Sequence, residues 1–259
     1  MANAETSLAS YRDVGDPAAL ERKGLFVAEG RLTVERLLDE RRFEVESVAV
    51  TPAAAQALAT VLARHPGVPV HVCDPPDLEA VTGFAFHRGC LALARRPEAP
   101  ALATFATATR LLALEGVGNP DNVGGLFRVA LALGASGVLL DRTSADPLYR
   151  KAIRTSMAAS LRVPFTRVEP WPSALDDLKG RGFTVVALTP DPEAVPIDAY
   201  ELEPGSRFIL VLGSEGPGLR PESMGYADAR LRIPIDPRAD SLNVVVAAGI
   251  ALTSLRARV

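Results

Sequence analysis

The chain has 259 residues, of which 48% are hydrophobic and 23% are charged, and its formal net charge is -3 at pH 7. This composition is ordinary for a globular chain that folds as one large domain or two modest ones, and it excludes an intrinsically disordered protein. The small negative net charge excludes a chain that is basic throughout.

Targeting and redox signals are weak in this sequence. The first ten residues, MANAETSLAS, lack a basic segment followed by an apolar one, and the longest uncharged apolar run covers only residues 129–140. We therefore expect a cytoplasmic protein without a membrane span. Cys73 and Cys90 form no CxxC pair and accompany three histidines, so we expect two small buried thiols and neither a metal site nor a disulfide framework.

The first part of the chain predicts a small α/β domain. Strand patterns cover residues 43–50, 68–72 and 90–94, and a helix pattern covers 52–65. We place this domain at 1–96. The Pro- and Ala-rich segment 97–107 follows and is typical of a linker.

The second part, 108–259, alternates strand and helix patterns. The expected strands cover residues 111–117, 137–141, 164–168, 183–188, 208–213 and 231–235, and the expected helices cover 123–133, 149–160, 171–179 and a segment from 241 onward. This alternation predicts a parallel sheet covered by helices on both faces. Ligands bind at the carboxyl ends of the strands in such sheets.

Arg128 is the only charged residue between positions 122 and 140, a stretch that otherwise holds apolar and small residues. The pattern predicts a buried helix followed by a buried strand. A buried guanidinium must meet a carboxylate, a ligand anion or the mouth of an active site. We therefore expect the functional site near this residue.

A basic segment follows Arg128 in the sequence. Between residues 142 and 167 there is one acid, Asp146, and six basic residues, Arg142, Arg150, Lys151, Arg154, Arg162 and Arg167. The segment fits a solvated helix face, but its nearness to Arg128 favours phosphate contacts. We expect nucleic-acid contacts at Arg142, Arg150, Lys151 and Arg154.

Three strand ends carry unusual residues. EGVGNPDNVGG (115–125) fits neither the dinucleotide fingerprint nor a P-loop, although Asp121 or Asn122 can cap the next helix. GSEGPGL (213–219) combines glycine backbone with one carboxylate, Glu215, and has no elbow serine. In SLNVVVAAGIAL (241–252), preceded by Asp240, either Asp240 or Ser241 can cap the helix, which leaves Asn243 to orient a substrate group or an opposing side chain.

These three segments resemble, in order and spacing, the three motifs of the SpoU/TrmH family of RNA methyltransferases within the SPOUT superfamily. The resemblance covers residues 108–256. FVAEGRLTVERLL (26–38) and FHRGCLALARRP (86–97) also resemble the small substrate-binding domain of that family, which is similar to an RNA-binding ribosomal protein.

The resemblance implies a deep trefoil knot in the C-terminal domain and a site for S-adenosylmethionine. The implied cofactor contacts are Leu188, Thr189, Gly213, Gly216, Ile233, Leu242 and Asn243, and the implied catalytic residues are Asn122, Arg128, Glu215, Ser241 and Asn243. No metal is expected. The family pattern implies a homodimer. The last helix, with its Val, Ala and Leu face and Gly249, fits part of that interface and fits packing within one chain equally well. Ala158 stands where the family pattern has glycine.

The implied reaction is transfer of a methyl group to a ribose 2'-hydroxyl of RNA. Because a guanidinium is a poor base, we expect Arg128 to bind the adjacent phosphate and stabilise the developing alkoxide, with Glu215 as its ion-pair partner. The N-terminal domain favours ribosomal RNA over tRNA. The alternatives are a non-catalytic RNA-binding protein of the same fold, a tRNA methyltransferase acting on a base nitrogen and, more distantly, a nicotinamide-dependent enzyme.

Overall fold

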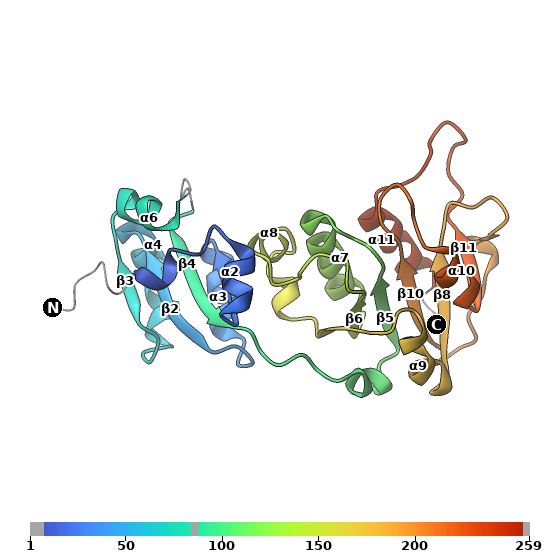
Figure 1. The fold of residues 1–259 in the computed structure, drawn as a ribbon, viewed down its shortest axis with the longest axis horizontal. Helices are drawn as coiled ribbons and strands as arrows, with labels where there is room; N and C mark the ends of the chain where they lie inside the picture. The colour runs from blue at the N-terminus through green and yellow to red at the C-terminus, as the bar shows by residue number, and fades with distance from the viewer. Residues whose placement is uncertain (1–7, 84–87, 256–259) are drawn as a thin grey trace. The chain divides into compact units, whose positions relative to one another are not determined.

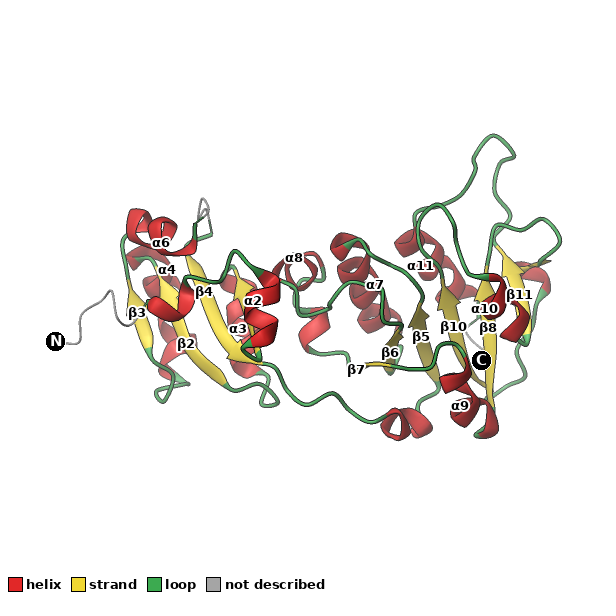
Figure 2. Ribbon diagram, in the orientation of Figure 1, coloured by secondary structure: helices red, strands yellow, loops and turns green. Residues whose placement is uncertain are grey.

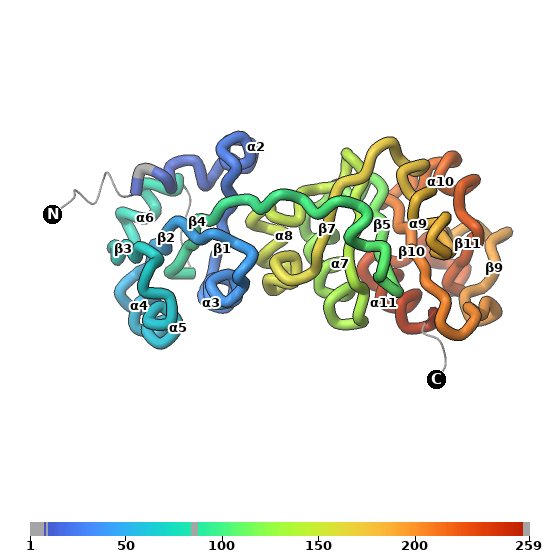
Figure 3. The backbone as a smooth tube through the Cα atoms, turned by 90° about the horizontal axis from the view of Figure 1, so that it is seen from below, coloured from blue at the N-terminus to red at the C-terminus, as the bar shows by residue number. Residues whose placement is uncertain are grey.

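The computed structural model describes residues 8–83 and 88–255, and the chain forms two compact units (Figures 1 and 3). The first unit consists of residues 1–98 and 148–162, and the second of residues 99–147 and 163–259. Two details differ from the predicted domains. Residues 148–162 belong to the first unit, and most of the expected linker belongs to the second. Residues 86 and 87, the first two of the segment FHRGCLALARRP, lie outside the described residues.

The first unit contains a four-stranded sheet with the order β1-β4-β2-β3 in its described residues. Its strands are β1 (Leu25–Glu29), β2 (Val45–Val50), β3 (Val70–Val72) and β4 (Cys90–Arg95). β4 pairs antiparallel with β1 and β2, and β2 pairs parallel with β3. The three expected strands are confirmed, whereas β1 was not expected.

Short helices surround this sheet. They are η1 (Ala9–Tyr11), α2 (Pro17–Arg22), α3 (Arg31–Asp39), α4 (Pro52–Ala57), α5 (Ala59–Ala63) and α6 (Pro75–Thr82). The helix expected over 52–65 is divided into α4 and α5. Cys90 is fully buried, as expected, but Cys73 is only partly buried.

The segment 148–162 adds α8 (Arg150–Thr155) and η3 (Ala159–Leu161) to the first unit, where α8 contacts β1. Arg150 forms an ion pair of 2.9 Å with Glu29, whose side chain is buried. The helix expected over 149–160 ends early because Met157 and Ala158 are left-handed, with φ of 51° and 63°. This backbone region favours glycine, which is what the family pattern has at position 158.

The second unit is built on a seven-stranded sheet, counted over its described residues, with the order β7-β6-β5-β10-β8-β11-β9 (Figure 2). Every strand pair is parallel, which confirms the predicted parallel sheet. The strands are β5 (Arg110–Leu114), β6 (Gly137–Leu140), β7 (Phe165–Arg167), β8 (Phe183–Leu188), β9 (Val195–Pro196), β10 (Arg207–Leu212) and β11 (Ala229–Arg232). β10 is inserted between β5 and β8.

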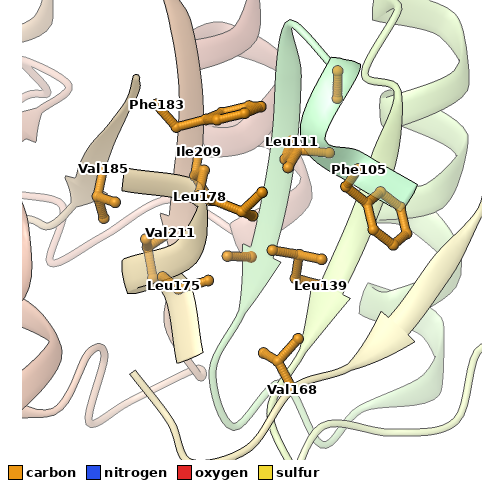
Figure 4. Close-up of a cluster of buried hydrophobic side chains, with 12 residues drawn as sticks. Phe105, Leu111, Leu139, Val168, Leu175, Leu178, Phe183, Val185, Ile209 and Val211 are labelled. Atoms are coloured by element: carbon orange, nitrogen blue, oxygen red, sulfur yellow. The ribbon is translucent and has the colours of Figure 1, made fainter. Parts of the chain in front are cut away.

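Helices cover both faces of this sheet. On one face, alternate residues of the strands pack against η2 (Leu102–Thr107), η4 (Ser173–Leu175) and α9 (Asp176–Gly180), forming the cluster in Figure 4. Phe105 of η2 lies so close to Gly137 that a Cβ there would overlap the Phe105 ring. The predicted linker therefore contributes a core side chain to the second unit.

The other face of the sheet carries α7 (Pro120–Leu133) and α11 (Val244–Ser254), which contact each other as well as β6 and β10 respectively. Both helices were expected, although α11 begins at residue 244 rather than 241. α10 (Pro221–Tyr226), η5 (Ile197–Ala199) and β9 were not expected. Within residues 8–83 and 88–255, no helix has the length and apolar character needed to cross a membrane.

Candidate functional site

A cavity of about 450 Å³ lies at the carboxyl ends of β8, β10 and β11. This is the edge at which parallel sheets bind ligands. The lining residues are Leu188, Thr189, Pro190, Leu212, Gly213, Ser214, Glu215, Gly216, Gly218, Ile233, Ile235, Ser241, Leu242, Asn243, Val244 and Ala247. The structure therefore brings together all seven expected cofactor contacts, along with Glu215 and Ser241 from the expected catalytic set.

The loop after β10 forms one wall of the cavity and folds tightly back on itself. A Cβ on Gly213 would lie 2.5 Å from the backbone nitrogen of Leu219, so no other residue fits there without moving backbone. Ser214 Oγ donates to the Gly218 carbonyl at 3.3 Å. Because Gly216 and Gly218 have positive φ, the loop exposes backbone to the cavity at low steric cost.

Asn243, in the third motif, is joined to the other two motifs by hydrogen bonds from its single amide nitrogen. Its Nδ2 donates to Asn122 Oδ1 at 3.1 Å and to Glu215 Oε1 at 3.2 Å, while its Oδ1 accepts from the backbone nitrogen of Val245 at 2.9 Å. Asn243 is thus the N-cap of α11, and not Asp240 or Ser241 as expected. Three of the expected catalytic residues meet in this cluster.

The capping bond also determines which way the two amides face. Since a backbone N–H can only donate, Asn243 must present its oxygen to Val245 and its nitrogen to Asn122. Asn122 therefore presents its oxygen to Asn243 and keeps its own Nδ2 on the opposite side. That nitrogen is buried and is the one described buried side-chain atom that lacks a hydrogen-bond partner. Asn122 does not cap α7, because the N-cap is Asn119.

The cluster depends on a close approach between α7 and α11. A Cβ on Gly125 would lie 2.6 Å from Cγ2 of Val245, so the absence of a side chain at 125 lets the helices meet. Asn122 lies one turn before Gly125 on α7, and Asn243 lies just before α11. Close packing at this crossing brings the two amides within hydrogen-bond distance.

Arg128 was expected to be buried and paired with Glu215, and both expectations are wrong. The residue is exposed, and among the described residues it forms no ion pair. The helix turns Val123, Leu126, Phe127 and Ala130 inward and places Arg128 on the outer face with Leu131, which is 37% exposed. This outer face also carries apolar residues, so the sequence pattern did not show that it is exposed.

The expected nucleic-acid contacts are divided between the two units. Arg142 is exposed and follows β6 in the second unit, whereas Arg150, Lys151 and Arg154 belong to α8 in the first unit. Arg150 is half-buried and holds Glu29. The structure therefore does not establish one continuous patch from these residues.

In the second unit, two buried carboxylates at strand ends were missed. Glu115, which ends the β5 segment, accepts hydrogen bonds from Trp171 Nε1, from Ser223 Oγ and from the backbone nitrogen of Arg220, the last at 2.6 Å. The guanidinium of Arg220 is 3.3 Å from Glu115. This network anchors the end of the glycine loop to the strand that precedes the first motif. The sequence signal that could have identified Glu115 was a lone carboxylate at the end of an apolar strand.

Asp141 is the second buried carboxylate and ends the β6 segment. It accepts from Thr143 Oγ1 at 2.6 Å, from Ser144 Oγ at 2.7 Å and from the backbone nitrogen of Gly116 at 3.1 Å. Burial raises the pKa of this carboxyl, but the hydrogen bonds outweigh it and hold the pKa below its usual value. Asp141 thereby fixes the loop of the first motif.

Comparisons with known proteins agree with the geometry. The model of the SpoU rRNA Methylase family matches residues 109–253. An uncharacterized tRNA/rRNA methyltransferase of Mycobacterium bovis is 39% identical over 236 residues, which cover 88% of this chain and 80% of that protein. The 23S rRNA (guanosine-2'-O-)-methyltransferase RlmB of Acinetobacter baylyi is 31% identical over 198 residues, or 74% of this chain and 79% of that protein.

A solved structure extends the similarity to both units. The structure of a putative TrmH-family RNA methyltransferase from Porphyromonas gingivalis has a TM-score of 0.81 and 26% identity, and the alignment covers 99% of this chain and 98% of that one. Together with the family match and the relatives above, this shows that the chain belongs to the SpoU rRNA methylase family.

Proposed function

We propose that this protein transfers a methyl group from S-adenosylmethionine to a ribose 2'-hydroxyl of RNA, with ribosomal RNA favoured over tRNA. The observation that carries the proposal is the cavity at the strand ends with the Asn122–Asn243–Glu215 cluster beside it. The choice of ribosomal RNA and of the ribose rests on the relative from Acinetobacter baylyi, which is named for guanosine 2'-O methylation of 23S rRNA.

The cavity fits the cofactor in size and lining. Its volume of about 450 Å³ lies within the range of about 300–1,000 Å³ of ligand pockets. Aliphatic side chains suit a nucleoside ring, and glycine backbone supplies polar groups without side-chain bulk. We assign cofactor contacts to Leu188, Thr189, Gly213, Gly216, Ile233, Leu242 and Asn243. When bound, S-adenosylmethionine supplies a methyl group activated by a positively charged sulfur.

Methyl transfer requires alignment more than strong acid or base chemistry. The ribose oxygen would form a bond to the methyl carbon as the carbon–sulfur bond breaks, the electron pair of that bond would stay on sulfur, and the hydroxyl proton would pass to solvent water. Asn122, Ser241 and Asn243 would orient the ribose and the phosphate beside it. Arg128 would bind that phosphate and stabilise the developing alkoxide, because a guanidinium holds its proton and is a poor base.

A homodimer would complete the site. The outer faces of α7 and α11 expose Leu131, Val246 and Ile250, which are 37%, 51% and 37% exposed. A Cβ on Gly249 would meet no atom within 4 Å in this chain, so the residue leaves room for a close neighbour. We propose that a second copy covers this face and that Arg128, which is exposed on α7, acts within the assembled dimer.

Three further expectations remain part of the proposal. The deep trefoil knot is supported by the insertion of β10 between β5 and β8 and by the return of α11 onto α7. For RNA contacts we propose Arg142, Lys151 and Arg154, with Arg150 acting partly through Glu29. A cytoplasmic location would follow from a ribosomal RNA substrate.

Arg128→Ala tests the proposal. We expect loss of methyl transfer with little change in S-adenosylmethionine affinity, because Arg128 does not line the cavity. Methyl transfer to ribosomal RNA and calorimetric titration of the cofactor measure the two effects. Arg22→Ala, an exposed arginine of the first unit, is the matched control and should retain both. Normal turnover by Arg128→Ala would refute the assigned role.

A further inference from the structure

The charge of the cavity comes from one side chain. Among the described residues that line it, Glu215 is the only one that carries a charge, and the others are aliphatic, glycine, proline, hydroxyl or amide residues. The carboxylate is exposed rather than buried in the protein. A ligand in this cavity therefore meets a single negative charge and no positive one from the lining.

The hydrogen bond that Glu215 accepts leaves its negative charge uncancelled. Its Oε1 accepts from Asn243 Nδ2 at 3.2 Å, and that amide is neutral. Arg128 forms no ion pair with it in the described part of the chain. The guanidinium of Arg220, which follows the same loop, lies instead at 3.3 Å from Glu115 and 4.0 Å from Asp141.

A hydrogen bond from a fixed amide also holds the carboxylate at the cavity. Asn243 is fixed at the start of α11 by its bond to the backbone nitrogen of Val245 and is held on its other side by Asn122. The same Asn243 nitrogen holds Glu215 at the cavity wall. A charge placed in this way acts on the ligand through space and needs no direct contact.

We propose that Glu215 makes the cavity selective for the cationic S-adenosylmethionine over its neutral product, S-adenosylhomocysteine. The inference rests on the proposed function and adds a specificity role for this side chain. The two compounds differ in one methyl group and in the positive charge on sulfur, so a carboxylate in the wall favours the first. Methyl transfer removes that charge and with it the attraction, which promotes release of the product.

The test is calorimetric titration of both compounds into wild-type protein and into Glu215→Gln. Glutamine keeps the shape of the side chain and an oxygen that can accept from Asn243, so the variant removes the charge alone. The ratio of the two dissociation constants cancels every interaction that the compounds share. We expect Glu215→Gln to reduce the preference for S-adenosylmethionine by about three- to tenfold, the effect of about 0.6–1.4 kcal/mol for a partly solvated charge pair.

Two controls sharpen the result. Glu222→Gln removes the same charge from an exposed residue of α10 outside the cavity lining, and it should leave the ratio unchanged. Raising the ionic strength should reduce the preference of the wild-type protein, because salt screens an exposed charge. Circular dichroism of each variant verifies that the fold is retained.

The outcomes separate this inference from the proposed function. If both compounds bind the wild-type protein and Glu215→Gln leaves the ratio unchanged, the selectivity role is wrong while the methyltransferase assignment stands. If neither compound binds the wild-type protein, the proposed function fails and this inference fails with it. A reduced ratio in Glu215→Gln but not in Glu222→Gln supports the inference.

Discussion

Gly125→Ala should force apart the two helices that carry Asn122 and Asn243. The new methyl would lie 2.6 Å from Cγ2 and 3.0 Å from Cγ1 of Val245. A β-branched side chain in a helix has one strongly preferred χ1 rotamer, so Val245 cannot turn away cheaply. Overpacking of this kind costs about 1–3 kcal/mol, against which the higher helix propensity of alanine returns about 1 kcal/mol.

A double-mutant cycle with Val245→Ala isolates the clash. Alanine at 125 gains helix propensity whether residue 245 is valine or alanine, so this gain cancels in the cycle. The clash between the new methyl and Val245 occurs only when the Val245 methyls are present. We expect a coupling free energy of about 1–3 kcal/mol, with the double variant more stable than the two single effects predict. Urea unfolding followed by circular dichroism measures all four proteins.

The same coupling should be measurable in the rate of methyl transfer. Gly125→Ala should reduce methyl transfer by lengthening the bond between Asn243 and Asn122, and Val245→Ala should restore part of the activity in the double variant. Additivity of the stability effects to within about 0.5 kcal/mol would refute the close approach on which the geometry of the site depends.

Three further predictions concern buried polar groups. Glu115→Ala should destabilise the protein by about 1–3 kcal/mol, because Trp171, Ser223 and the backbone nitrogen of Arg220 lose their shared acceptor; a loss below about 0.5 kcal/mol in urea unfolding would contradict this. The pKa of Asp141 is lower in the folded protein than in the unfolded chain, so its contribution to stability is present above pH about 4 and is lost as the pH falls through the lower folded value. Thermal unfolding from acid to neutral pH should therefore show a shallower acid dependence for Asp141→Asn, and an unchanged slope would count against it. Burial raises the pKa of Cys90 to about 12, so a thiol reagent at mildly alkaline pH should modify Cys73 well before Cys90; rapid modification of native Cys90, located by mass spectrometry, would be the contrary result.

The core of the second unit was predictable because its central strands, β5, β8 and β10, are largely apolar. β8 and β10 lie between two layers of helices, so most residues of FTVVAL and FILVLG are buried, and a continuous apolar run is the signal of such strands. The same rule failed for β1, whose apolar run LFVA is short and ends at Glu29. That glutamate is buried because Arg150, far along the chain, neutralises it.

The error at Arg128 has a physical cause. Apolar residues occupy several sides of α7, so the periodic pattern could not identify the solvent-exposed face. Arg128 itself was the main sequence feature that marked this face. Apolar residues remain exposed there, including Leu131. This is the face that we propose a second copy covers.

The motif residues could be selected from the sequence, but their hydrogen bonds could not. Asn122 and Asn243 are separated by 121 positions, and no local pattern shows that one amide holds the other. The bonds of Glu115 likewise connect residues 56 to 108 positions apart. These contacts arise from the topology that places the ends of β5, β10 and β11 near one another.

The most direct test of the central claim is transfer of labelled methyl from S-adenosylmethionine to ribosomal RNA taken from cells that lack this protein, followed by digestion and separation of the nucleosides. We predict that the label is found in a 2'-O-methylated nucleoside, whose linkage resists alkaline hydrolysis, and that Arg128→Ala abolishes it. Label in a base-methylated nucleoside, or no transfer to any RNA by protein that binds the cofactor, would contradict ribose methylation.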